Sequence, residues 1–144
     1  MTSSRPSPVA IPVADLVRTA RFYDAFLGPL GFRRLVRAGP YLGYSNGPIS
    51  VWFVAADPAR SGAGAAGDER DHLAFEVGSE AEVTAFAQAL RVAGLPPDRG
   101  PDEHRDLRPA AVSSLWLDPD GAVVEVFAPR RSRAPVAAAL HRGR

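Results

Sequence analysis

The chain has 144 residues, 46% of them hydrophobic and 23% charged, a composition typical of one globular domain with its own core. It contains no cysteine and no lysine, which excludes disulfides, thiolate metal sites and lysine Schiff-base chemistry. No apolar stretch is long enough to span a membrane and the first residues lack a hydrophobic signal region, so we expect a cytoplasmic protein with no membrane contact.

The basic charge is concentrated at the end of the chain. The net charge is +1, but five arginines follow Pro129 without any acidic residue among them. The residues up to Pro129 therefore carry an acidic balance, which favours a neutral or cationic ligand. Because no aromatic residue is interleaved with these arginines, we interpret residues 129–144 as a solvated basic tail and expect no nucleic-acid partner.

The first half of the chain predicts a strand, a helix and three strands. Residues 1–7 are rich in serine and proline and predict a loose arm, followed by an edge strand over residues 8–13. Asp15 stands at the N-cap of a helix whose apolar side chains recur at helical spacing as far as Leu27. Turns containing glycine and proline then separate three predicted strands: 32–37, 41–45 and 49–54.

The second half repeats this order after a Gly- and Ala-rich linker over residues 55–70. A strand is predicted at 71–77, and Ser79 begins a capping box for a helix through Ala93. The rest of this half is predicted as follows: a weak strand at 97–100, a charged loop at 101–109, strands at 111–117 and 122–127, and a short helix at 134–140.

This order predicts an α+β fold with two βαβββ modules, 8–54 and 71–128, in one domain over residues 8–128. Each module alone would have a half-covered sheet. Pairing the modules buries one face of each sheet and leaves a cup-shaped surface, where a small ligand would bind.

Two sets of side chains are candidates for that site. Glu125 is the only charge in the strand Val-Val-Glu-Val-Phe, so it must find a partner, a metal ion or a cavity, or else face solvent. Four aromatic residues on predicted strands either line the cup and stack on a planar ligand or pack in the core. They are Tyr41, Tyr44, Trp52 and Trp116.

Three segments together resemble the vicinal oxygen chelate superfamily, which includes glyoxalases, bleomycin-resistance proteins, fosfomycin-resistance enzymes and extradiol dioxygenases. They are Val9–Leu16 with its continuation to Phe32, Asp71–Val77, and Asp118–Gly121 with Glu125. The resemblance implies paired βαβββ modules that form a cup, usually in a homodimer.

In metal-using members of this superfamily, the resemblance implies a divalent ion bound in the cup. His72 matches the ligand position of the fifth strand and Glu125 that of the eighth, a pair that suits Zn, Ni, Mn or Fe(II). Pro8 stands at the first ligand position, and the fourth strand offers Ser50 and Trp52, neither of which is a good ligand. His104 either supplies a third ligand from the charged loop or faces solvent.

Three functions remain open at this point. The first is a metal-dependent lyase, isomerase or dioxygenase-like enzyme that polarises vicinal oxygens of a small substrate. The second is a metal-free protein that binds a drug or metabolite. The third is a metal-free enzyme with His72 and Glu125 as acid and base. The candidate ligand contacts are Trp52, Ser50, Tyr41, Trp116 and His104.

Overall fold

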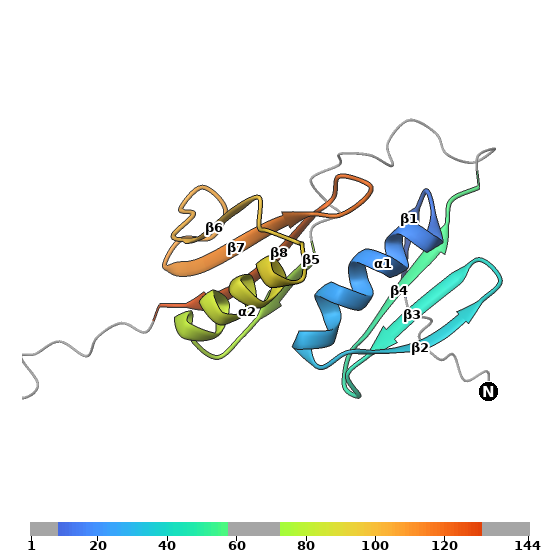
Figure 1. Cartoon of the computed structure of the whole chain (residues 1–144), viewed down its shortest axis with the longest axis horizontal. Coiled ribbons are helices and arrows are strands. Elements are labelled where there is room, and N and C mark those ends of the chain that lie inside the picture. The colour runs from blue at the N-terminus through green and yellow to red at the C-terminus, as the bar shows by residue number, and fades with distance from the viewer. Residues whose placement is uncertain (1–8, 58–72, 131–144) are drawn as a thin grey trace, which may run out of the picture.

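The computed structural model describes residues 9–57 and 73–130, which form two modules of the same order (Figure 1). The first module consists of β1 (Ala10–Val13), α1 (Leu16–Leu27), the 3₁₀ turn η1 (Gly28–Leu30), β2 (Arg33–Ala38), β3 (Tyr41–Ser45) and β4 (Ser50–Ala55). The second consists of β5 (Leu73–Glu76), α2 (Glu80–Val92), β6 (Arg99–Asp102), β7 (Ala111–Leu117) and β8 (Val123–Pro129).

Each module folds into a mixed four-stranded sheet with the same topology. The strand orders are β1-β4-β3-β2 and β5-β8-β7-β6. The first strand of each module pairs in parallel with its last strand, and the remaining pairs are antiparallel. The predicted α+β fold with two βαβββ modules is confirmed.

Both helices begin where the sequence places their caps. The Asp15 side chain accepts hydrogen bonds from the backbone N–H groups of Val17 and Arg18, and the Ser79 hydroxyl accepts one from Glu82. These bonds satisfy N–H groups that have no partner within the first helical turn. Neither of these two described helices is long and apolar enough to cross a membrane.

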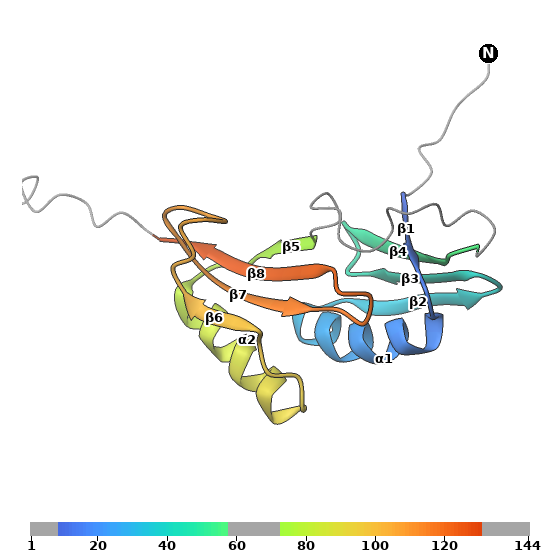
Figure 2. The same ribbon diagram turned by 90° about the horizontal axis from the view of Figure 1, so that it is seen from above.

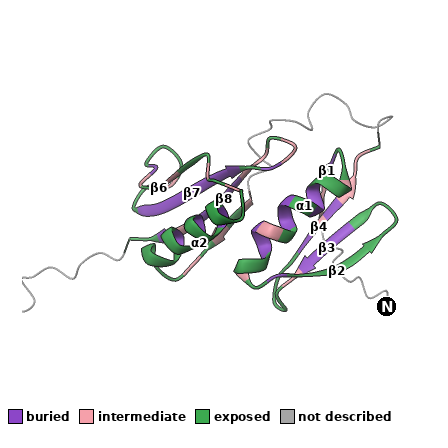
Figure 3. Ribbon diagram, in the orientation of Figure 1, coloured by how far each residue is buried: buried purple, intermediate pink, exposed green. Residues whose placement is uncertain are grey.

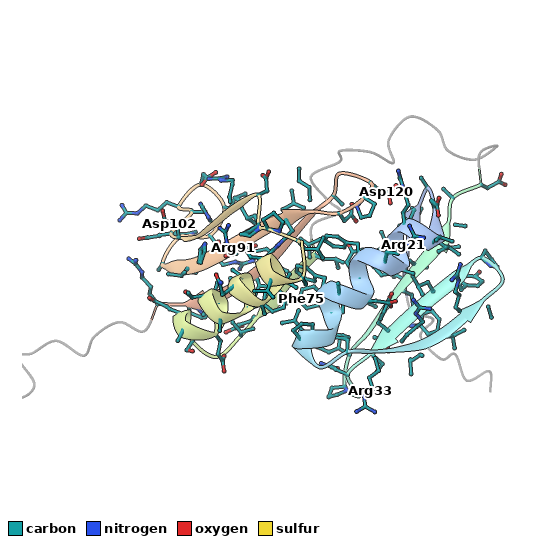
Figure 4. The ribbon with its side chains drawn as sticks, in the orientation of Figure 1. Arg21, Arg33, Phe75, Arg91, Asp102 and Asp120 are labelled. Carbon is teal, nitrogen blue, oxygen red and sulfur yellow. The ribbon has the colours of Figure 1, made fainter. Side chains whose placement is uncertain are left out.

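The core lies between the modules and is organised around α1. Phe26 on α1 makes edge-to-face contacts with Phe86 of α2 and with Trp116 of β7, each with ring centroids 5.2 Å apart. Phe75 of β5, labelled in Figure 4, packs between the modules against Phe26 and Phe32. Because Phe26 of α1 contacts rings of the second module, the two modules share one apolar cluster.

The hairpin turn between β7 and β8 is hydrogen-bonded to α1 and to the residue that precedes its cap. The Tyr23 hydroxyl donates to Asp118 Oδ2 at 2.9 Å, and the backbone N–H of Ala14 donates to Asp120 Oδ1 at 3.1 Å. Burial, followed by the charge of Asp118, raises the pKa of the Tyr23 phenol. The turn predicted from sequence therefore also joins the two modules.

Helices α1 and α2 lie on the same side of the two sheets (Figure 2). The sheet surfaces opposite them are named here the open face of the N-terminal sheet and the open face of the C-terminal sheet. β7 is nevertheless buried along most of its length (Figure 3). The loop over residues 103–110 connects β6 to β7. It forms a second layer over the open face of the C-terminal sheet, where its Arg108 contacts Glu125.

Several strand boundaries differ by one or two residues from their predictions, and β6 differs by two at both ends. The weak strand expected at 97–100 lies at Arg99–Asp102 instead. Gly100 has a φ of +89°, and a Cβ there would lie 2.3 Å from the carbonyl oxygen of Ser113 on β7. Glycine thus permits a close approach of two backbones at a position that looked like the end of a strand. The predicted arm, most of the predicted linker and the predicted helix at 134–140 lie outside the described residues.

Candidate ligand-binding site

The alternation of side chains along β4 places an aromatic surface on the open face of the N-terminal sheet. Val51 and Phe53 belong to the core, so Ser50, Trp52 and Val54 point to the opposite side. Tyr41 pairs with Val54 across the sheet and is 48% exposed. Three predicted ligand contacts, Ser50, Trp52 and Tyr41, therefore share one face.

The Trp52 indole lies flat over Gly43, its partner on β3. A Cβ on Gly43 would lie 2.7 Å from the nearest atom of the Trp52 ring. The missing side chain is what allows the indole to cover the strand, and Trp52 remains partly exposed. A partly exposed indole is a surface on which a planar ligand can stack.

Glu125 occupies the open face of the C-terminal sheet. Its neighbours in the sequence, Val124 and Val126, belong to the core on the helix side. Glu125 is paired in register with Ala74 of β5 and Leu115 of β7, and it is only 1% exposed. A carboxylate buried this deeply requires a charged or hydrogen-bonding partner.

Arg108 is that partner, and sequence analysis did not identify it. Its Nε donates to Glu125 Oε1 at 3.0 Å and its Nη2 donates to Oε2 at 3.3 Å. The guanidinium carbon also lies 3.6 Å from the centre of the Phe127 ring. The isolated charge in β8 left a partner, a metal ion, a cavity and solvent exposure all open, and a local pattern cannot select one of 17 basic residues.

The loop over residues 103–110 is held in the conformation that presents Arg108. The backbone N–H groups of Leu107 and Arg108 both donate to the carbonyl oxygen of His104. At the end of the loop, Arg130 donates from its backbone to Ala110 and from its side chain to Glu103. These bonds fix both ends of the loop, so Arg108 approaches Glu125 from a defined backbone.

His104, predicted to be a metal ligand or a solvent-exposed residue, is buried in this loop. Its Nδ1 lies 3.3 Å from Nη2 of Arg99, and its ring lies next to Gly100. Its Nε2 has no hydrogen-bond partner among the described residues. The contacts of His104 therefore secure the loop against β6 rather than exposing the ring to solvent.

Two of the four candidate aromatic residues, Trp116 and Tyr44, lie on the helix side instead of the open faces. Trp116 packs edge-to-face against Phe26 and Phe86, and its indole N–H donates to the carbonyl oxygen of Leu95 at 3.0 Å. The Tyr44 hydroxyl donates to Asp24 of α1 at 2.8 Å. Both side chains are core residues because their strand positions alternate with those on the open faces.

The described donor groups do not fit a divalent metal ion. Each oxygen of Glu125 already accepts a hydrogen bond from a guanidinium, and that cation would repel a metal ion at the same oxygens. Residues 9–57 and 73–130 hold no group of three or more metal-ligating side chains. His72 and Pro8, the other positions considered in the sequence, lie outside the described residues.

A separate groove of about 670 Å³ runs between the modules. It is bordered by β5, α2 and η1, and its lining includes Leu30, Phe32, Ile49, Phe75 and Phe86. None of the predicted site residues that the structure describes lines this groove. The groove therefore reaches β5 at the edge of the C-terminal sheet without including the described candidate residues.

Comparison with known proteins places this fold in a family. The model of the glyoxalase/bleomycin resistance protein/dioxygenase superfamily matches residues 5–126. No curated protein gives a significant match.

Solved structures agree with this match. A protein of Bacillus halodurans assigned as a glyoxalase is 26% identical, with a TM-score of 0.68 over 84% of this chain and 92% of its own. A glyoxalase/bleomycin resistance protein/dioxygenase from Nocardioides is 20% identical, with a TM-score of 0.68 over 93% and 90% of the two chains. The lactoylglutathione lyase from Agrobacterium tumefaciens is 21% identical, with a TM-score of 0.61 over 86% and 95%. Because the family model covers most of the sequence, the chain belongs to the glyoxalase/bleomycin resistance protein/dioxygenase superfamily, which is the vicinal oxygen chelate superfamily.

Proposed function

We propose that this protein binds a small drug or metabolite on the open faces of its sheets without using Glu125 as a metal ligand. The observation that carries this proposal is the pairing of both Glu125 oxygens with Arg108. Glu125 is buried and positions the arginine, whereas Arg108 is 36% exposed and can meet a ligand. Glu125 thus holds Arg108 in place on the open face of the C-terminal sheet, where the ligand binds.

The open face of the N-terminal sheet supports the same proposal. Trp52 and Tyr41 provide partly exposed aromatic surface, and Ser50 adds a hydroxyl group on the same face. Stacking on an aromatic side chain contributes on the order of 1 kcal/mol per contact. This combination suits a planar ligand.

The two catalytic alternatives both require Glu125 to change its partners. A metal-dependent lyase, isomerase or dioxygenase-like enzyme would hold Zn, Ni, Mn or Fe with His72 and Glu125, and Arg108 would have to leave. A metal-free acid–base enzyme would need substrate to reach Glu125, which is 1% exposed. The ion pair therefore favours the binding protein over both alternatives.

We also propose that the protein acts as a cytoplasmic homodimer and that residues 8–128 fold as one unit of two modules. Family members usually form homodimers. Leu35 and Val36 on β2 are 54% and 40% exposed, which provides apolar surface that a second copy can cover. Analytical ultracentrifugation of the full chain measures this directly, and a monomer at micromolar concentration would contradict it.

Metal analysis combined with tryptophan fluorescence tests the proposed function. Protein purified without chelator, and then incubated with Mn, Fe, Ni or Zn, should retain no stoichiometric metal. Stoichiometric metal that is lost in Glu125→Ala would support the metal enzyme instead. Product formed from a glyoxalase-type substrate in excess chelator, and abolished by Glu125→Ala, would support the acid–base enzyme.

The two tryptophans make the binding measurement specific to one surface. In Trp116→Phe the remaining fluorophore is Trp52 on the open face, and in Trp52→Phe it is Trp116 in the core. A panel of planar drugs and metabolites should include compounds that quench the first variant stoichiometrically and leave the second unchanged. Quenching of Trp116 alone would place the ligand away from the open faces.

A further inference from the structure

We propose that Arg108 selects the ligand of the C-terminal open face, and that this ligand carries a carboxylate group attached to an apolar or aromatic body. This inference rests on the proposed function and names the chemical class of the ligand. It reverses the expectation of a neutral or cationic ligand that followed from the acidic balance of residues 1–129.

The first step is the geometry of the guanidinium. Glu125 is bound through Nε and Nη2, which together form one edge of the Arg108 guanidinium. The second edge, between Nη1 and the other hydrogen of Nη2, has no acceptor among the described residues. Two parallel N–H groups on one edge match the two oxygens of a carboxylate.

The second step is the order already imposed on Arg108. Glu125 holds one edge, and Phe127 supports one face of the guanidinium with its ring centre 3.6 Å away. An arginine fixed in this way loses little side-chain freedom when a ligand binds. The Arg108 side chain is 36% exposed and that of Glu125 is 1% exposed, so the arginine is the member of the pair that a ligand can reach.

The third step is the pairing of the other acidic side chains around the loop. Glu103 is bound by Arg105 and Arg130, and Asp106 is bound by Arg99. These acids are therefore engaged by cations other than Arg108. No described carboxylate therefore occupies the second edge of the Arg108 guanidinium, where an added anion would bind.

The fourth step is the apolar surface next to Arg108. Phe127 lies on the same open face as Glu125, two residues further along β8, and its partly exposed ring is the one that faces the guanidinium. A purely inorganic anion would leave this surface in contact with water. A carboxylate with an apolar or aromatic body covers it and gains the hydrophobic contribution as well.

Isothermal titration calorimetry of the full chain tests the inference with 2-naphthoate and its neutral counterpart 2-naphthamide. The two probes share the same aromatic body and differ in charge. We expect the wild-type protein to bind naphthoate roughly 10- to 100-fold more tightly than naphthamide, the ratio associated with a hydrogen bond to a charged group.

Variants of the pair assign that preference to Arg108. In the double variant Arg108→Gln with Glu125→Gln, the two charges are removed together and a hydrogen-bonding pair remains, so the protein should stay folded and lose the preference for naphthoate. Arg108→Lys keeps the charge without the two-donor edge and should retain only part of the preference. Arg105→Gln is the matched control in the same loop, because Arg105 is 81% exposed and does not contact Glu125, and its ratio should equal that of the wild type. Circular dichroism and thermal unfolding verify the fold of each variant.

The outcomes separate the inference from the proposed function. Equal affinity for naphthoate and naphthamide, or a preference that survives in the double variant, overturns the inference and leaves small-molecule binding intact. A preference for inorganic phosphate over naphthoate also overturns it. Failure of all these probes to bind, together with no quenching of Trp52 by the planar compounds, overturns both proposals.

Discussion

Trp52 and Glu125 occupy equivalent positions in the two modules, yet they give the two open faces opposite chemistry. Each is the third residue of the last strand of its module. Each is paired with an alanine on the parallel neighbour, Ala10 for Trp52 and Ala74 for Glu125. The backbone topology is the same, so the difference arises entirely from side chains.

The residue on the antiparallel neighbour shows how each face is built. Gly43 faces Trp52 and leaves room for the indole to lie flat, whereas Leu115 faces Glu125 at the matching register position. Beside Glu125, the loop over residues 103–110 supplies Arg108 as a counter-ion, and residues 39–40 at the corresponding turn of the N-terminal sheet are too few to do so. The βαβββ fold thus provides two similar platforms, and a few residues decide the chemistry of each.

Breaking the ion pair should have the largest effect. Arg108→Ala removes the guanidinium that binds both oxygens of the buried Glu125 carboxylate, and we expect it to lower the free energy of unfolding by about 3 kcal/mol. The apolar double variant Arg108→Met with Glu125→Leu should recover most of this loss. Urea unfolding measures both values, and an unchanged unfolding midpoint in Arg108→Ala would show that the pair does not shape this face.

Removing a hydrogen bond between the modules, away from both open faces, should have the next largest effect on stability. Tyr23→Phe removes the hydrogen bond to the Asp118 carboxylate and should cost about 2 kcal/mol of unfolding free energy. Ligand binding to Trp52 should be unchanged if the two faces act independently. A matched loss of stability and of affinity would instead show that the junction couples them.

Alkaline unfolding isolates the tyrosines, because the chain has no lysine and no cysteine to titrate in the same range. Burial is the main cause that raises the pKa of Tyr23 and Tyr44 in the folded protein. In the unfolded chain the pKa of a tyrosine is about 10. Above that pH the unfolded state binds fewer protons than the folded state, so stability is complete below pH ~10 and falls as the pH rises. We expect a loss of roughly 1.4 kcal/mol per tyrosine between pH ~9 and ~11, reduced in Tyr23→Phe. Stability that is flat across this range would contradict the assignment.

Filling the space under the indole should disturb only the N-terminal face. Gly43→Ala places a methyl group against the Trp52 ring, which should swing away at a cost of about 1 kcal/mol and shift the tryptophan emission. Gly28→Ala is the control, because a Cβ there meets no atom within 4 Å. Emission that is unchanged in Gly43→Ala would contradict the flat placement of Trp52.

The exposed ion pair of the loop should contribute least. Asp106→Asn removes the partner of Arg99, but both side chains are about half exposed, so we expect less than about 0.5 kcal/mol. Urea unfolding compared with Arg108→Ala then contrasts a surface pair with a buried one. A loss as large as that of Arg108→Ala would show that the anchoring of the loop dominates over the burial of Glu125.

The local patterns predicted the elements of the fold well. The caps at Asp15 and Ser79 and the hairpin around Asp118–Gly121 act between residues close in sequence, so local chemistry is sufficient to recognise them. Strand β6 was placed two residues early because the close approach of Gly100 to Ser113 is a contact between strands. The shared face of Ser50 and Trp52 also follows from the period of two along β4, whereas the place of Tyr41 on that face depends on its pairing with Val54.

The sequence by itself determined that Glu125 needs a partner if it is buried, because a single carboxylate in an apolar strand cannot be buried alone. Only the tertiary structure decided which partner it has. Arg108 is separated from Glu125 by 17 positions and reaches it from an irregular loop, whose path is set by bonds to His104, Ala110 and Arg130. Likewise, the choice between core and open face for Trp116 depended on which side of β7 the helices cover, and that is a property of packing rather than of the strand.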